Sequence, residues 1–146
     1  MFDMSPYLVL IPGLPLLAAI VTAFLGPRLL RRHSHWPCVI GSLGACVVAL
    51  LAFWSVAHQE GEPLRHSYYN WIVTGDVHID FGLQADGLTA VMLLVITFIG
   101  SLIAIYSVGY MHGDEGYARF FAEIALFIFS MTGLVLASNF LVLYAF

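Results

Sequence analysis

Glu123 is a charged residue inside a long apolar stretch, since residues 120–146 carry no other charge. A charge at the centre of a bilayer costs about 2.5–3.5 kcal/mol on insertion scales, so such residues are candidates for function. Glu123 is therefore our candidate proton-relay residue. Arg119 lies one helical turn earlier on the same helix face. The second interpretation is an ion pair near a helix end that has no part in proton transfer.

The other titratable residues form no recognisable catalytic or metal-binding motif. No two of the six histidines have the i, i+4 spacing of a helical metal site with an acidic partner. His33 and His35 flank a basic loop and are expected to be solvated. Asp114 and Glu115 are adjacent, which suits a solvated turn better than an acid–base pair. Phosphate-loop, dinucleotide, nucleophile-elbow and haem motifs are absent, so we predict no metal site and no cofactor in this chain.

Composition places these residues in a membrane protein. Of the 146 residues, 61% are hydrophobic and 10% are charged, whereas about 25% are charged in an ordinary soluble domain. A soluble fold of this size needs more polar surface, so a soluble enzyme is excluded, as is a disordered chain. Five arginines and no lysine make no basic patch. The expected partner is therefore the lipid bilayer, and nucleic acid is not.

Hydropathy predicts an all-α transmembrane fold, and the arginines predict its orientation. The first apolar stretch covers residues 4–27 and the second residues 36–57, each close to the length that crosses a bilayer. Three of the five arginines stand between them: Arg28, Arg31 and Arg32. The positive-inside rule puts this loop in the cytoplasm, so the N-terminus is expected outside, in the periplasm of a Gram-negative bacterium.

The second span carries a stripe of small residues, and a polar stretch follows it. Gly41, Ala45 and Ala49 recur every four residues, which allows close helix contact in lipid. Residues 71–73 and 77–81 then predict a β-hairpin on the external face, because apolar and polar residues alternate in the second run. The turn falls at residues 74–76. We expect this hairpin to lie over the helix ends.

Two further spans are predicted after the hairpin, and then the start of a fifth helix. The third span begins at Asp86, a predicted N-cap, and runs to about Tyr110. The fourth covers residues 117–137, and the dipeptide Ser138-Asn139 separates it from a fifth helix that begins near Phe140. The chain ends within this apolar run, so we expect it to be the N-terminal piece of a longer protein.

Three segments carry a family resemblance. Residues 81–89 read Phe-Gly-Leu-Gln-Ala-Asp-Gly-Leu-Thr, residues 113–122 read Gly-Asp-Glu-Gly-Tyr-Ala-Arg-Phe-Phe-Ala, and residues 134–141 read Leu-Val-Leu-Ala-Ser-Asn-Phe-Leu. They resemble, in turn, the start of the third helix, the second conserved block and the start of the fifth helix of one family. That family is the antiporter-like subunit L of NADH:quinone oxidoreductase (respiratory complex I), called chain 5 in mitochondria.

The resemblance implies a subunit of a proton pump in the bacterial inner membrane, with the other membrane subunits of complex I as partners. It implies that NADH, flavin, iron–sulfur clusters and quinone belong to partner subunits. The family's proton transfer relies on a buried glutamate of the fifth helix, in a Trp-Glu-Gly-Val-Gly sequence that would follow Phe146, and on lysines and histidines further on. We therefore transfer none of these proton carriers to residues of this chain. Glu123 replaces a tyrosine or apolar residue of the family pattern, and Ser138 replaces an aspartate.

The predicted organisation has two parts. Residues 1–85 are expected to form the first two helices and the hairpin, and residues 86–146 to begin a proton-translocating helical domain. The leading function is proton translocation coupled to quinone reduction elsewhere in the complex. One alternative is the large subunit of an Mrp-type Na⁺/H⁺ antiporter, which shares the Asp-Gly-Leu helix start. Another is a membrane scaffold that transports nothing itself.

Overall fold

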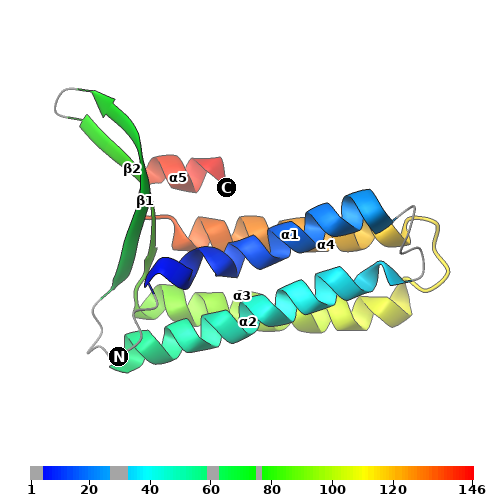
Figure 1. Cartoon of the computed structure of the whole chain (residues 1–146). Helices are drawn as coiled ribbons and strands as arrows, with labels where there is room; N and C mark the ends of the chain where they lie inside the picture. The colour runs from blue at the N-terminus through cyan, green and yellow to red at the C-terminus, as the bar shows by residue number, and fades with distance from the viewer. Residues whose placement is uncertain (1–4, 27–32, 59–62, 75–76) are drawn as a thin grey trace.

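The computed structural model describes residues 5–26, 33–58, 63–74 and 77–146, which form a helix bundle with a β-hairpin at one end (Figure 1). A short 3-10 helix, η1 (Ser5–Val9), continues directly into α1 (Leu10–Leu25). The other long helices are α2 (His35–His58), α3 (Gly87–Tyr110) and α4 (Tyr117–Leu136), and α5 (Phe140–Ala145) comes last.

Four helical segments of this described part are long and apolar enough to cross a membrane: η1 with α1, α2, α3 and α4. This confirms the predicted all-α transmembrane class, and the predicted spans differ from the helices by only one or two terminal residues. The arginines of the predicted cytoplasmic loop, Arg28, Arg31 and Arg32, lie outside the described residues. So do residues 75–76 of the predicted turn.

The helices pack closely through the small residues of α2. Helix α1 contacts both α2 and α4, and α3 also contacts both of them. A Cβ atom added at Gly41 would come within 2.7 Å of the Ala18 Cβ of α1. Ala45 and Ala49 continue the same stripe and are fully buried. The predicted small-residue face is therefore the surface at which α2 meets its neighbours, as expected where close van der Waals packing stabilises helices in lipid.

The hairpin pairs β1 (Leu64–Thr74) with β2 (Val77–Ala85) in antiparallel fashion. Its first strand begins at Leu64, so the predicted start at residue 71 is wrong. The pairing is irregular at two places, between Ser67 and Tyr69 and between Asn70 and Ile72. Each irregularity interrupts the alternation of side chains between the two faces. The start of β1 precedes both irregularities, but Arg65, His66 and Ser67 are consecutive polar residues, so no alternation of apolar and polar residues marks it in the sequence.

The base of the hairpin packs over the helix ends, as predicted. Leu64, Leu83 and Ala85 belong to one apolar cluster with buried residues of η1, α1, α2, α3 and α4. Figure 1 shows both strands rising from this end of the bundle, beside the start of α1 and the end of α4. Burial of one aliphatic side chain stabilises a fold by about 1.5–3 kcal/mol. The hairpin is therefore anchored in the same core that holds the helices together.

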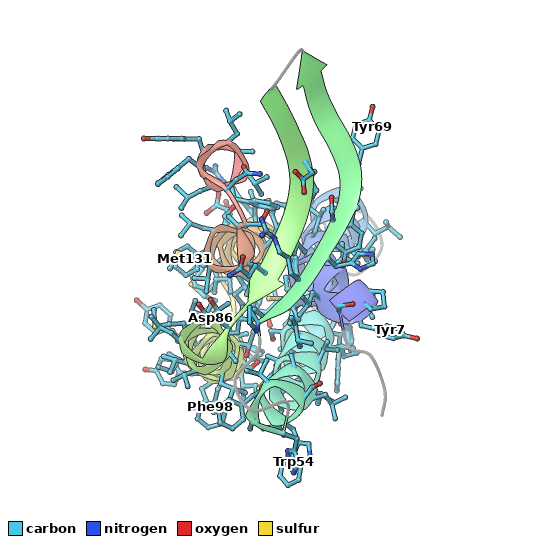
Figure 2. The ribbon with its side chains drawn as sticks, turned by 90° about the vertical axis from the view of Figure 1, so that its left-hand side faces the viewer. Tyr7, Trp54, Tyr69, Asp86, Phe98 and Met131 are labelled. Carbon is cyan, nitrogen blue, oxygen red and sulfur yellow. The ribbon has the colours of Figure 1, made fainter. Side chains whose placement is uncertain are left out.

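The outer surface of the bundle is apolar and aromatic. Figure 2 looks along the helices from the hairpin end, and Tyr7, Trp54 and Phe98 point away from the bundle in this view. Trp54 is 65% exposed and Phe98 is 57% exposed. An apolar surface of this extent is unusual for a soluble protein and is suited to contact with lipid.

Inside the bundle, the buried hydroxyls of Thr97 and Thr132 are satisfied by their own helices. Thr97 donates a hydrogen bond to the Leu93 carbonyl, and Thr132 donates one to the Ile128 carbonyl, both at 2.7 Å. These bonds join residues four apart within one helix, so they hold no neighbouring helix in place. Contacts between elements must therefore come from apolar packing and from the polar residues at the helix ends.

Candidate functional site

Helix α4 has polar side chains at both of its ends. Arg119 and Glu123 lie in its first two turns, at the end of the bundle that is away from the hairpin (Figure 1). Ser138 and Asn139 follow its last turn, at the hairpin end. The first pair is charged and the second is not.

The charged pair forms an ion pair on the outside of the bundle. Arg119 Nε donates a hydrogen bond to Glu123 Oε1 at 2.7 Å, across one helical turn. The two side chains are 85% and 61% exposed. An exposed pair of this kind contributes little to stability. The Glu123 carboxylate thus lies on the surface of the described bundle, and its role as a proton relay stays a prediction.

A groove between α1 and α4 opens beside this ion pair. Its volume is about 340 Å³, and three of its lining residues are polar: Thr22, Arg119 and Glu123. Thr22 is fully buried, and within the described part of the chain its hydroxyl has no hydrogen-bond partner. The remaining lining is aliphatic or aromatic, and includes Leu16, Ala19, Ile20, Ala23, Ala122 and Leu126. The groove is therefore apolar along its length and charged on one side.

Asn139 joins the start of α5 to the hairpin. Its side-chain Nδ2 donates a hydrogen bond to the Asp80 carbonyl of β2 at 2.7 Å. Its Oδ1 accepts a hydrogen bond from the Val142 backbone N–H at 2.9 Å and so caps the helix. One amide side chain thus fixes both the first turn of α5 and the strand beside it.

The backbone next to Asn139 continues this contact, which we call the seam between β2 and the α4–α5 junction. The Ser138 N–H donates to the Gly82 carbonyl at 3.3 Å, and Ala137 forms an antiparallel bridge with Leu83. A Cβ atom added at Gly82 would lie 2.9 Å from the Ser138 hydroxyl oxygen. The close approach of the two segments therefore requires glycine at this position.

The groups that form the seam do not titrate near neutral pH. Its contacts come from backbone groups, the Ser138 side chain and the Asn139 amide, none of which titrates near neutral pH. In the described part of the chain, no three His, Cys, Asp or Glu side chains gather as metal ligands. The arrangement is thus suited to holding α5 in a fixed place and direction.

Tyr68 ties the other strand of the hairpin to η1. Its hydroxyl donates to the Pro6 carbonyl at 3.0 Å and accepts from the Val9 N–H at 3.3 Å. Partial burial raises the pKa of Tyr68 above its ordinary value, so the phenol stays a donor at neutral pH. The hairpin therefore connects the start of α1 to the start of α5.

Asp86 caps α3, as the sequence predicted. Its Oδ1 accepts a hydrogen bond from the Thr89 backbone N–H at 2.7 Å. This bond stabilises the charged carboxylate and lowers the pKa of Asp86 below its ordinary value. Asp86 directly follows the hairpin, so the cap fixes the point at which the chain turns from β2 into α3 (Figure 2).

One contact at the opposite end of the bundle was not predicted. The Tyr117 hydroxyl and His35 Nδ1 are 2.9 Å apart and join the starts of α4 and α2. His35 is partly buried, so the expectation that it is solvated is wrong, whereas His33 is exposed. The two partners are 82 residues apart in the sequence. No local pattern could have paired them.

Comparison with known proteins decides the family. The family model described as "NADH-Ubiquinone oxidoreductase (complex I), chain 5 N-terminus" matches residues 71–121. NADH-quinone oxidoreductase subunit L of Neisseria meningitidis serogroup A is 31% identical over 145 residues, which is 99% of this chain and 21% of that protein. The chain belongs to the complex I subunit L and chain 5 family.

Other subunit L relatives match at similar levels. NADH-quinone oxidoreductase subunit L of Mycobacterium tuberculosis is 38% identical over 147 residues, covering 94% of this chain and 22% of the relative. The chloroplastic NAD(P)H-quinone oxidoreductase subunit 5 of Lolium perenne is 40% identical over 119 residues, covering 82% of this chain and 16% of the relative. The chain spans about a fifth of the length of the bacterial subunit L relatives. Arg119 lies inside the segment matched by the family model, and Glu123 lies outside it.

Proposed function

We propose that this chain contributes to proton translocation in the membrane part of an NADH:quinone oxidoreductase. Membership of the subunit L family supports this assembly, and four apolar helices support its place in a bilayer. In this proposal NADH, flavin, iron–sulfur clusters and quinone are bound by partner subunits. The other membrane subunits of the complex are the partners of this chain.

The observation that carries the proposal is the seam at Asn139. The family resemblance expects the proton-carrying glutamate in the fifth helix, and Asn139 caps that helix while bonded to β2. Successive residues of a helix are rotated by about 100° about its axis. Fixing the first residue therefore also fixes the direction in which every later side chain points. A shift at Asn139 would therefore redirect every side chain of the fifth helix.

The two parts of the chain have different roles in this proposal. Residues 1–85 supply packing helices and a hairpin that connects helix starts, and residues 86–146 begin the translocating domain. One apolar cluster contains residues of both parts, including Leu8, Leu64 and Leu93. This shared core supports the proposal that residues 1–85 hold residues 86–146 in place.

The proposed orientation puts the N-terminus and the hairpin in the periplasm of a bacterium with an inner membrane. The start of α1 and the hairpin lie at one end of the bundle, and the α3–α4 turn with Arg119 lies at the other (Figure 1). The arginines of the sequence favour this second end as the cytoplasmic one. A cysteine placed at exposed Tyr69 should react with a membrane-impermeant thiol reagent from the periplasmic side. Reaction from the cytoplasmic side alone would reverse the orientation.

The test of the proposed function is the number of protons pumped per NADH oxidised by the assembled complex. We expect Asn139→Leu to lower this ratio, because the variant loses both the cap and the bond to Asp80. Asn139→Asp is the matched variant, since aspartate keeps the cap and loses the donor. We expect it to pump at a ratio between those of wild type and Asn139→Leu. An unchanged ratio in Asn139→Leu, in complexes that assemble normally, would contradict the proposal.

The same assay separates the other functions. Sodium-dependent proton exchange without quinone reductase activity would indicate an Mrp-type antiporter instead. For this chain alone in liposomes we expect no proton conductance above background, because the ion pair within its spans lies on the outside. Loss of pumping in Glu123→Gln would establish Glu123 as a relay.

A further inference from the structure

The Arg119–Glu123 pair leaves most of its hydrogen-bonding capacity unused. The hydrogen bond between the two side chains uses one N–H of a guanidinium that has five, and one oxygen of a carboxylate that has two. Both side chains are largely exposed beside the α1–α4 groove. Within the described part of the chain, the pair therefore presents guanidinium N–H groups and a carboxylate oxygen side by side, each open to a further partner.

The groove beside the pair starts near a helix end and runs toward the middle of the bundle. Its α4 wall extends from Ala118 to Leu126, and its α1 wall from Leu16 to Phe24. Eight residues of helix span about 12 Å. The charges thus lie near the end of a membrane span, where lipid headgroups are found, and the apolar lining continues inward to the depth of acyl chains.

We propose that this groove binds a zwitterionic phospholipid with a primary ammonium group, of the phosphatidylethanolamine class. The phosphate accepts hydrogen bonds from the free Nη groups of Arg119, and the ammonium donates to the free oxygen of Glu123. One acyl chain lies along the apolar walls formed by Ala19, Ala122 and Leu126. No covalent step is involved.

Charge complementarity selects this occupant. A phosphatidylglycerol headgroup offers Arg119 the same phosphate but has no cationic group to pair with the Glu123 carboxylate. A phosphatidylcholine headgroup has a quaternary ammonium and no N–H to donate. A helix of another polypeptide could fill the apolar walls, but it would need both an anionic and a cationic group at one end. Phosphatidylethanolamine carries both groups in one headgroup.

The experiment uses the assembled complex and a phosphatidylethanolamine with a photoreactive acyl chain. We expect labelling of peptides from α1 and α4, and stronger competition by unlabelled phosphatidylethanolamine than by phosphatidylcholine, by about fivefold or more. Glu123→Gln should bring the ratio of competition by phosphatidylethanolamine to competition by phosphatidylcholine closer to one. Arg119→Gln should weaken competition by both lipids. Arg65→Gln is the matched charge control, since Arg65 lies on the hairpin away from the groove.

The shape of the groove is tested separately. Leu126→Trp should fill the groove and reduce labelling, whereas Phe127→Trp, at a neighbouring exposed position outside the lining, should not. Equal competition by the two zwitterionic lipids would overturn the proposal, and so would stronger competition by phosphatidylglycerol. Labelling that is unaffected by Leu126→Trp would also overturn it. A cross-link from the groove to another polypeptide would identify a helix as the occupant instead.

Discussion

The two ends of helix α4 use polar residues in opposite ways. At one end, Arg119 and Glu123 carry full charges, yet they are exposed and bond only to each other in the described bundle. At the other end, Ser138 and Asn139 are uncharged, yet they join α5 to β2 through bonds between segments about 60 residues apart. A polar residue in a membrane bundle shapes the fold through the partners it finds, and its charge matters less. The following predictions test this difference.

The largest effect is expected for Asn139→Leu. The variant removes a helix cap and leaves the Asp80 carbonyl without its donor, at a combined cost of about 2 kcal/mol. The thermal unfolding midpoint of the detergent-solubilised protein should fall, and hydrogen exchange of the Val142 amide should accelerate. Asn139→Asp should recover protection at Val142 but not the full midpoint. Equal unfolding midpoints for wild type and Asn139→Leu would mean that the seam does not stabilise the fold.

Gly82→Ala should have the next largest effect. The new Cβ would lie 2.9 Å from the Ser138 hydroxyl oxygen and 3.3 Å from the His66 carbonyl. Overpacking costs about 1 kcal/mol at the low end of its range, which applies here because the nearest atom is a hydroxyl that can rotate away. Removing the hydroxyl in the double variant Gly82→Ala/Ser138→Ala should restore part of the unfolding midpoint. If the second substitution lowers the midpoint further, the close approach at the seam is not the cause of the loss.

Asp86 is the charged cap of α3 and can be compared with Asn139, the uncharged cap of α5. Replacement by alanine should cost about 1 kcal/mol, and replacement by asparagine much less, since both Asp and Asn are good caps. Because the Thr89 N–H lowers the pKa of Asp86, its contribution is full above the ordinary carboxyl pKa and is lost as the pH falls through the lowered value. The midpoint difference between wild type and Asp86→Asn should therefore change only in acid. A difference that changes near neutral pH would contradict this assignment.

The smallest effect on stability is expected for the ion pair. A double-mutant cycle of Arg119→Gln and Glu123→Gln should give a small coupling between the two side chains that decreases with added salt. Unfolding midpoints of the four proteins provide the measurement. A large coupling that added salt does not weaken would mean that the pair is shielded from water by contacts beyond the described bundle.

The helices could be predicted from sequence because each requirement is local. Twenty or so apolar residues cross a bilayer wherever the rest of the chain lies, and Asp86 marks a helix start by its own side chain. The stripe at Gly41 follows from spacing alone. These features need no knowledge of distant partners.

The connections between elements could not be predicted in this way. Ser138-Asn139 was recognised as a break in an apolar run, and an asparagine before such a run is a signal for a helix cap. Its second partner, the Asp80 carbonyl, is 59 residues away and has no sequence signature. The start of β1 has no apolar–polar alternation in the sequence, because Arg65, His66 and Ser67 are consecutive polar residues. Long-range backbone contacts of this kind require the folded structure.

The most direct test compares Asn139→Leu and Glu123→Gln in the same assembled complex, with protons pumped per NADH oxidised as the readout. We expect a clear fall in this ratio for Asn139→Leu and, on the interpretation of Glu123 as part of an exposed ion pair, a wild-type ratio for Glu123→Gln. The reverse result, with Glu123→Gln failing to pump and Asn139→Leu pumping normally, would contradict this expectation. Proton transfer would then depend on the charged end of α4, and the seam would be a local feature of the fold.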